Sequence, residues 1–197
     1  MSFLQNSYYW RVFLLVTLAL LSCACICCPW FDPRGLLIDD DHPNPQIELL
    51  KSYVPAETLP DVNPDYFTYF GFRDWWRWPL VYPYSIHAID TVDHGRLLDE
   101  SEVTDYDDIN HQPLGSIGVW DITHLALDRR YLLLRTEEEK DDVLTVIYVL
   151  FDCSTAEKTE FDSEAALFEA AQAAGFEGDL TLMTLRDYDA LFWQEAP

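Results

Sequence analysis

Residues 130–153 carry the strongest fold signal of the chain and read R-Y-L-L-L-R-T-E-E-E-K-D-D-V-L-T-V-I-Y-V-L-F-D-C. The segments Arg130–Thr136 and Val143–Cys153 are rich in leucine, valine and aromatic residues, which is typical of strands, and they flank the charged turn Glu137–Asp142. Ile117–Leu127 precedes them, alternates apolar with polar residues, and is separated from them by a short connection. Such short links predict three neighbouring strands in an antiparallel meander.

Two helices are expected after the meander. Asp162 or Ser163 caps the first, which shows a narrow face of small residues and ends at Gly175. Thr184 caps the second, and Asp187 completes an approximate capping box. The small-residue face of the first helix is suited to close docking on the sheet, and Leu185, Tyr188, Leu191 and Phe192 mark the buried face of the second.

The fold class that follows is α+β, with one domain over residues 65–197. We expect an antiparallel sheet of four or five strands, with the two C-terminal helices packed on one face and an N-terminal membrane tether ahead of the domain. Val81–Asp90 supplies a further strand, and Asp179–Met183 a short edge strand. The polar, acidic segment Thr91–Gly115 is predicted to be a long loop.

The N-terminal segment Val12–Phe31 is uncharged and follows Arg11. Two interpretations are open. Residues 1–22 form a signal peptide, because Leu20-Leu21-Ser22-Cys23 resembles the bacterial lipobox; Cys23 is then lipidated, with Cys25 as a weaker second position. Alternatively, residues 12–31 form an uncleaved membrane anchor of about 20 residues. Both interpretations predict an exported body attached to a membrane of the cell envelope, facing the periplasm or the exterior.

Residues 23–64 are rich in proline and acidic residues. Proline removes a backbone donor and disfavours helix at the residue before it. This composition predicts a semi-extended stalk, with one short helix at Gln46–Tyr53.

The charge of the chain limits the classes of partner. It has 35 acidic and 12 basic residues, for a net charge of −23. Nucleic acid is excluded as a partner, because no basic stripe exists to neutralise phosphates. Anionic lipid surfaces are also repelled, so membrane attachment depends on the N-terminal lipid or helix. A basic protein partner fits this charge, and colloidal solubility explains it equally well.

An aromatic cluster lies between Asp65 and Tyr84 and is a candidate ligand surface. Its rings either stack on a sugar or peptide, or cover one face of a sheet, and burial is favoured because each ring contributes about 2–3 kcal/mol when buried. The candidate contact residues are Trp75, Trp76, Trp78, Arg73 and Arg77.

No catalytic or cofactor motif stands out, so the sequence predicts a non-catalytic protein without a cofactor. His87 and His124 lie in predicted strands and are weak metal candidates, for which a structural role is favoured. Cys153 ends a predicted strand and is expected to be a buried free thiol, with a disulfide to an N-terminal cysteine as the alternative.

The stretch Trp78–Phe176 resembles a group of uncharacterised small bacterial lipoproteins. The resemblance rests on Leu127–Tyr131, on the strand end Phe151-Asp152, and on the helix Ser163–Gly175. It implies location and fold, and it carries no active residues.

Three functions follow as hypotheses. The leading one is a non-catalytic, membrane-tethered lipoprotein that binds another envelope component. The second is an inhibitor or immunity protein, held outside the cytoplasm, that meets a basic toxin or hydrolase. The third is a glycan-binding module that uses surface tryptophans.

Overall fold

The computed structural model describes residues 44–68, 70–72, 74–101, 117–141 and 143–193. All of them belong to one compact unit, Asp39–Pro197. The predicted signal peptide or anchor, with Cys23 and Cys25, lies outside the described residues, as does Arg73. Within the described part of the chain, no helix is both long and apolar enough to span a bilayer.

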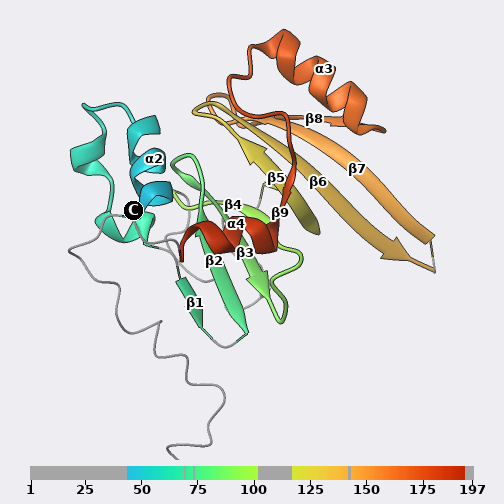
Figure 1. Ribbon diagram of the computed structural model, residues 1–197, viewed down its shortest axis with the longest axis horizontal. Helices are drawn as coiled ribbons and strands as arrows, with labels where there is room; N and C mark the ends of the chain where they lie inside the picture. Colours follow the sequence, from blue (N-terminus) through green and yellow to red (C-terminus); the bar gives the residue numbers. More distant parts are fainter. Residues whose placement is uncertain (1–43, 69, 73, 102–116, 142, 194–197) are drawn as a thin grey trace, which may run out of the picture. The chain divides into compact units, whose positions relative to one another are not determined.

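The body is α+β and contains two antiparallel sheets (Figure 1). The four-stranded sheet has the order β1-β2-β3-β4. Its strands are β1 (Phe70–Phe72), β2 (Trp75–Pro79), β3 (Tyr84–Ile89) and β4 (Arg96–Asp99). The five-stranded sheet has the order β8-β7-β6-β5-β9. Its strands are β5 (Ile122–Leu127), β6 (Tyr131–Lys140), β7 (Val143–Asp152), β8 (Glu157–Phe161) and β9 (Met183–Thr184).

The main core lies between the inner faces of the two sheets. Side chains alternate along a strand, so every second residue of β2, β3 and β6 enters this core. Trp78 and Ile86 of the first sheet share one buried cluster with Leu132, Leu134 and Phe151 of the second. The two sheets also meet at the backbone, where Gly95 and Ile122 exchange hydrogen bonds of 2.9 and 2.8 Å. The prediction of one sheet was therefore wrong: the strands divide between two sheets that share a core.

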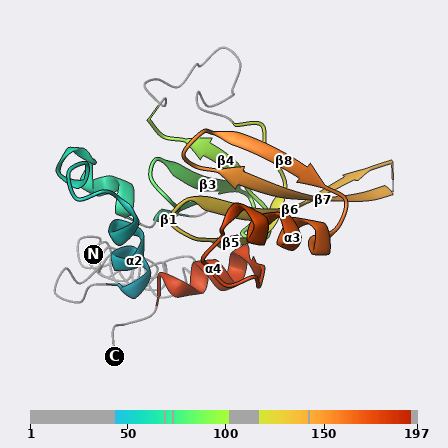
Figure 2. The same ribbon diagram turned by 90° about the horizontal axis from the view of Figure 1, so that it is seen from above.

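The two C-terminal helices lie on opposite faces of the five-stranded sheet. Helix α4 (Leu185–Leu191) sends Leu185 and Tyr188 into the core between the sheets. Helix α3 (Glu164–Ala174) buries Leu167 and Ala171 against Leu133, which points away from that core. Figures 1 and 2 show α3 covering the outer side of β6, β7 and β8. The predicted packing of both helices on one face was wrong, because alternate residues of β6 are buried on both faces.

The capping predictions were confirmed. The Ser163 hydroxyl accepts the amide of Ala166, and Gly175 ends α3 with φ 88°, a left-handed conformation that glycine adopts without steric cost. Thr184 accepts the amide of Asp187 at the start of α4. Ser163 and Thr184 each satisfy a backbone donor that the first helical turn leaves open, and the Gly175 amide donates to carbonyls of the last turn of α3.

Residues 44–67 fold onto the body instead of forming an extended stalk. They comprise α2 (Pro45–Tyr53) and two short 3₁₀ helices, η2 (Leu59–Asp61) and η3 (Pro64–Phe67). Their apolar residues form a second buried cluster, which contains Leu50, Val54, Val62, Tyr66 and Phe67. The Asn44 side chain caps α2 and also donates to the Leu191 carbonyl at 3.1 Å. The predicted helix at Gln46–Tyr53 is present, but the stalk prediction was wrong from residue 44 onward, because apolar residues between the prolines supply a core.

Candidate functional site

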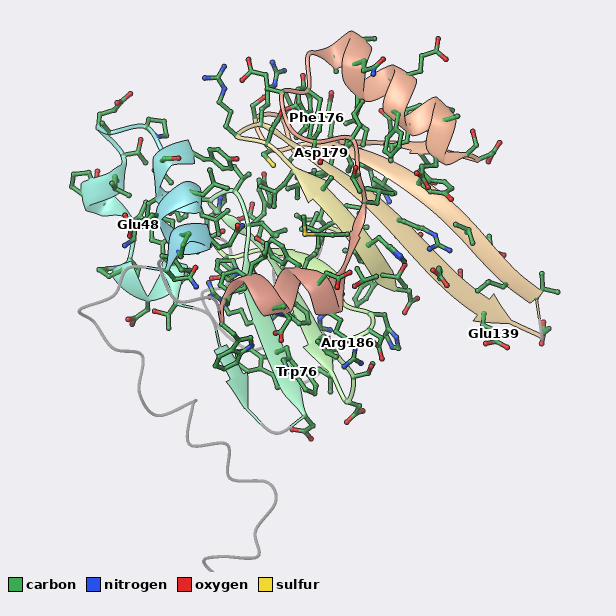
Figure 3. All side chains as sticks on the ribbon, in the orientation of Figure 1. Glu48, Trp76, Glu139, Phe176, Asp179 and Arg186 are labelled. Carbon is green, nitrogen blue, oxygen red and sulfur yellow. The ribbon has the colours of Figure 1, made fainter. Side chains whose placement is uncertain are left out.

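The three candidate tryptophans do not form one surface. Trp78 is fully buried in the main core, and its Nε1 donates to Asp189 Oδ1 at 2.8 Å. Trp76 points to the same side of β2 and is half-buried against that core (Figure 3). Trp75 points to the opposite side, where its ring lies edge-on to the His87 ring with centroids 5.4 Å apart. A stacked sugar would therefore have no continuous platform over these rings.

Arg77 is the centre of a buried polar network on the outer face of the four-stranded sheet. Its guanidinium donates to both carboxylate oxygens of Glu100, at 2.7 and 2.6 Å, and to the carbonyls of Tyr66 and Thr68 at 2.9 and 2.8 Å. His87 Nε2 lies 3.4 Å from Glu100 Oε1. Arg77 thus ties η3 to β2 and to the end of β4, and its donors serve the fold rather than a ligand.

The pKa values of this network follow from burial and hydrogen bonding. Burial by itself raises the pKa of Glu100, but hydrogen bonds with His87 and Arg77 outweigh it and lower the pKa to about 2. The Ser85 hydroxyl contributes to the same lowering, although its geometry falls outside that of a hydrogen bond. Burial lowers the pKa of His87, against the opposing effect of Glu100. Near neutral pH the network is a buried ion pair beside a neutral imidazole.

His124 lies in a different environment from His87. A β-bulge between Ile122 and His124 turns Thr123 and His124 to the outer face of the five-stranded sheet, where His124 Nδ1 lies 2.9 Å from Thr123 Oγ1. Arg135 lies beside His124 and pairs with Glu137 at 2.9 Å. Burial first, and the Arg135 charge second, lower the pKa of His124.

The two weak metal candidates are not brought together. His87 and His124 lie on outward faces of different sheets. Within the described ranges, no three His, Cys, Asp or Glu side chains are grouped so that they could hold a metal ion. Cys153 has a free thiol whose pKa is raised by burial, which leaves it a poor nucleophile.

The distal half of the β6–β7 hairpin has exposed residues on both strands. Strands β6 and β7 pair over their whole length, from Tyr131 opposite Asp152 to Lys140 opposite Val143. Their neighbours are shorter: β5 begins opposite Thr136, and β8 ends opposite Tyr148. The hairpin therefore extends beyond the rest of the sheet as a two-stranded ribbon, which Figures 1 and 2 show from two directions.

The two strands of this ribbon differ in chemistry. On β6, Glu138 and Glu139 are exposed, and Asp141 follows in the turn; Figure 3 labels Glu139 near the tip of the hairpin. On β7, Val143 and Leu144 are 62% and 56% exposed. An acidic strand thus lies beside a strand with exposed apolar residues, outside the core.

The sequence interpretation missed this surface because it assigned Glu137–Asp142 to a turn. In the structure, β6 continues to Lys140, so three glutamates lie in a strand. The start of β7 contained the missing signal: if a strand begins at Val143 and follows a tight hairpin turn, the residues just before the turn, Glu137–Lys140, are placed opposite its first four residues.

Comparison with known proteins adds no relative: no family model, no curated protein and no solved structure matches the chain.

Proposed function

We propose that this protein is a non-catalytic component of a bacterial cell envelope, which is tethered by its N-terminal segment and binds a protein partner through the distal β6–β7 hairpin. The observation that carries the proposal is the projection of that hairpin beyond the sheet, with Val143 and Leu144 exposed. Exposed apolar residues that are rimmed by charges are typical of protein-binding surfaces. The uncharged segment Val12–Phe31 supports the tether.

The tether is tested by metabolic lipid labelling of the wild type and of Cys23→Ser. If Cys23 is the lipidated residue, the label disappears in the variant, and globomycin blocks processing of the wild type. A label that is unchanged in Cys23→Ser would point to Cys25, and absence of label from the wild type would point to the uncleaved anchor. A reporter fused to the C-terminus and active only in the cytosol would contradict envelope localisation in either form.

Partner binding is tested in cells with a photo-crosslinking amino acid at Leu144. We expect one discrete crosslinked product from position 144 and none from position 57, because Glu57 is exposed on the connection between α2 and η2, away from the hairpin. Equal crosslinking patterns from the two positions would contradict a specific role for the hairpin.

An inhibitor or immunity protein is the second candidate, and the shape of the same hairpin favours it. A narrow acidic ribbon fits a cleft with basic walls, such as the active site of a hydrolase or toxin. The two candidates differ in outcome: an inhibitor abolishes the activity of the crosslinked partner at equimolar ratio, whereas a binding protein leaves that activity unchanged. The glycan-binding hypothesis has less support, because Trp78 is fully buried and Trp75 points away from Trp76.

A further inference from the structure

Within the part of the chain that the structure describes, the outer edge of β7 is unpaired where the hairpin projects. Strand β8 pairs with Tyr148–Asp152 and then ends at Phe161, because Ser163 caps α3 only two residues later. Among the described residues, no strand lies opposite Val143–Ile147 on that side. Backbone donors and acceptors along an unpaired edge are a template for another strand.

The two edges of the ribbon differ in how well they are protected against pairing with another strand. Proteins commonly guard an exposed edge with charged side chains or proline. The β6 edge carries three consecutive glutamates, Glu137–Glu139. The β7 edge, V-L-T-V-I, has neither a charge nor a proline over its open length. The unguarded edge is therefore the one on β7, and its residues have high strand propensity.

We propose that the β7 edge, Val143–Ile147, accepts a basic, extended segment of the partner as an added strand. This inference rests on the proposed function and specifies the class of partner and the mode of binding. Backbone hydrogen bonds supply affinity in this mode, and alternate side chains supply specificity.

Charge complementarity identifies the occupant. Glutamates of β6 lie on both faces of the ribbon, since Glu138 is opposite Thr145 and Glu139 is opposite Leu144. An added strand would lie about 10 Å from β6, two strand spacings away, which the long side chains of lysine and arginine partly bridge. A second copy of this chain fits the edge less well, because each copy carries a net charge of −23.

The test uses the full-length chain in detergent micelles and a synthetic peptide of about nine residues in which lysine and valine alternate. A peptide with glutamate in place of lysine is the control for charge. We expect the lysine peptide to bind and to slow hydrogen exchange of the amides of Val143–Ile147. Its affinity should fall as the salt concentration rises, because salt screens the attraction between opposite charges. The glutamate peptide should not bind.

Thr145→Lys places a repelling charge on the open edge, and Thr155→Lys makes the same change in the exposed turn between β7 and β8. We expect Thr145→Lys to lower the affinity for the lysine peptide by roughly fivefold or more. Thr155→Lys should keep the affinity within about twofold of the wild-type value. Unchanged far-UV circular dichroism and melting temperature show that both variants are folded.

Three results would overturn the inference: exchange protection outside β7, equal binding of both peptides, or protection of Val143–Ile147 that rises with protein concentration alone, which would identify a second copy as the occupant. If position 144 still crosslinks one partner in cells while the lysine peptide fails, the proposed function stands and only strand addition is wrong. If position 144 gives no specific product either, the proposed function fails as well.

Discussion

Trp78 on β2 and Asp189 on α4 are joined by a 2.8 Å hydrogen bond although 111 residues separate them in the chain. The bond lies where α4 meets the four-stranded sheet, and Tyr188, next to Asp189, donates to the Pro79 carbonyl at 2.8 Å. The last helix is therefore held to the first sheet by two hydrogen bonds as well as by the core that they share.

We expect Trp78→Phe to lower the free energy of unfolding by about 2–4 kcal/mol, because it removes buried volume and a donor to a carboxylate. Trp193→Phe is the matched control: Trp193 also donates to Asp189, at 3.2 Å, but is 45% exposed, and its loss should cost less than about 1 kcal/mol. Urea denaturation followed by far-UV circular dichroism measures both. Equal costs would show that Trp78 does not anchor α4.

The Arg77–Glu100 ion pair makes the free energy of unfolding fall at acidic pH. Because the pKa of folded Glu100 is about 2 and its ordinary value is 4.5, its ionised form contributes stability that is present above pH 4.5 and lost as the pH falls toward 2. Glu100→Gln should cost on the order of 3 kcal/mol at pH 7 and flatten the dependence of stability on pH below 4.5. Asp152→Asn is the necessary comparison, because a hydrogen bond from Arg130 also lowers the pKa of Asp152 to about 2. An unchanged acid slope in Glu100→Gln would assign the effect to other carboxylates.

Arg135 should control the titration of His124 and leave His87 unaffected. Removal of its charge in Arg135→Gln removes the second cause of the lowered pKa of His124, so this pKa should rise toward 6.5. In the wild type, His124 binds a proton less readily in the folded state than in the unfolded state, so its protonation destabilises the fold. The free energy of unfolding therefore rises as the pH increases toward 6.5, and this effect is complete above that pH. NMR titration of the imidazole C–H signals follows both histidines. A shift of both, or of neither, would contradict separate environments.

Gly95 is required where the two sheets meet. A Cβ atom at this position would lie 2.6 Å from Ile86 Cγ2 and 2.8 Å from the His87 carbonyl oxygen, which belongs to the backbone and cannot move alone. Gly95→Ala should therefore destabilise the fold by about 2–3 kcal/mol. Gly118→Ala tests backbone strain instead of a steric clash, because the new Cβ would meet open space and only the φ of 71° is unfavourable. This substitution should destabilise the fold by about 1–2 kcal/mol. Thermal melts of the two variants should rank them in this order.

Local signals in the sequence predicted much of the five-stranded sheet and both C-terminal helices. The meander of β5, β6 and β7 follows from apolar segments joined by short turns, and Ser163, Gly175 and Thr184 mark helix ends by their own side-chain or backbone chemistry. These features depend on neighbours in sequence, so a single chain contains them.

Features set by distant partners were missed. Strand β8 is almost fully exposed and reads E-K-T-E-F, without an apolar pattern; it exists because β7 offers it an edge. Strand β4 lay within the predicted acidic loop, and its four residues are too few to show a period. The division into two sheets depends on register, which composition does not encode.

The arrangement of the candidate site residues also depends on the sheet and on distant partners. Trp75, Trp76 and Trp78 are adjacent in sequence, but alternation along β2 sends Trp75 away from the other two. The partner of Arg77 is Glu100, which is 23 residues away among many other carboxylates in that stretch.

The hydrogen bond between Asn44 and Leu191 brings the two ends of the described chain to the same side of the body. It fixes the start of α2 beside the end of α4, and in Figures 1 and 2 the tip of the β6–β7 hairpin lies at the other extreme of the folded unit. A fluorescent or affinity label attached at Trp193 would consequently lie on the side of the body where α2 begins, and would leave the tip of the β6–β7 hairpin unobstructed.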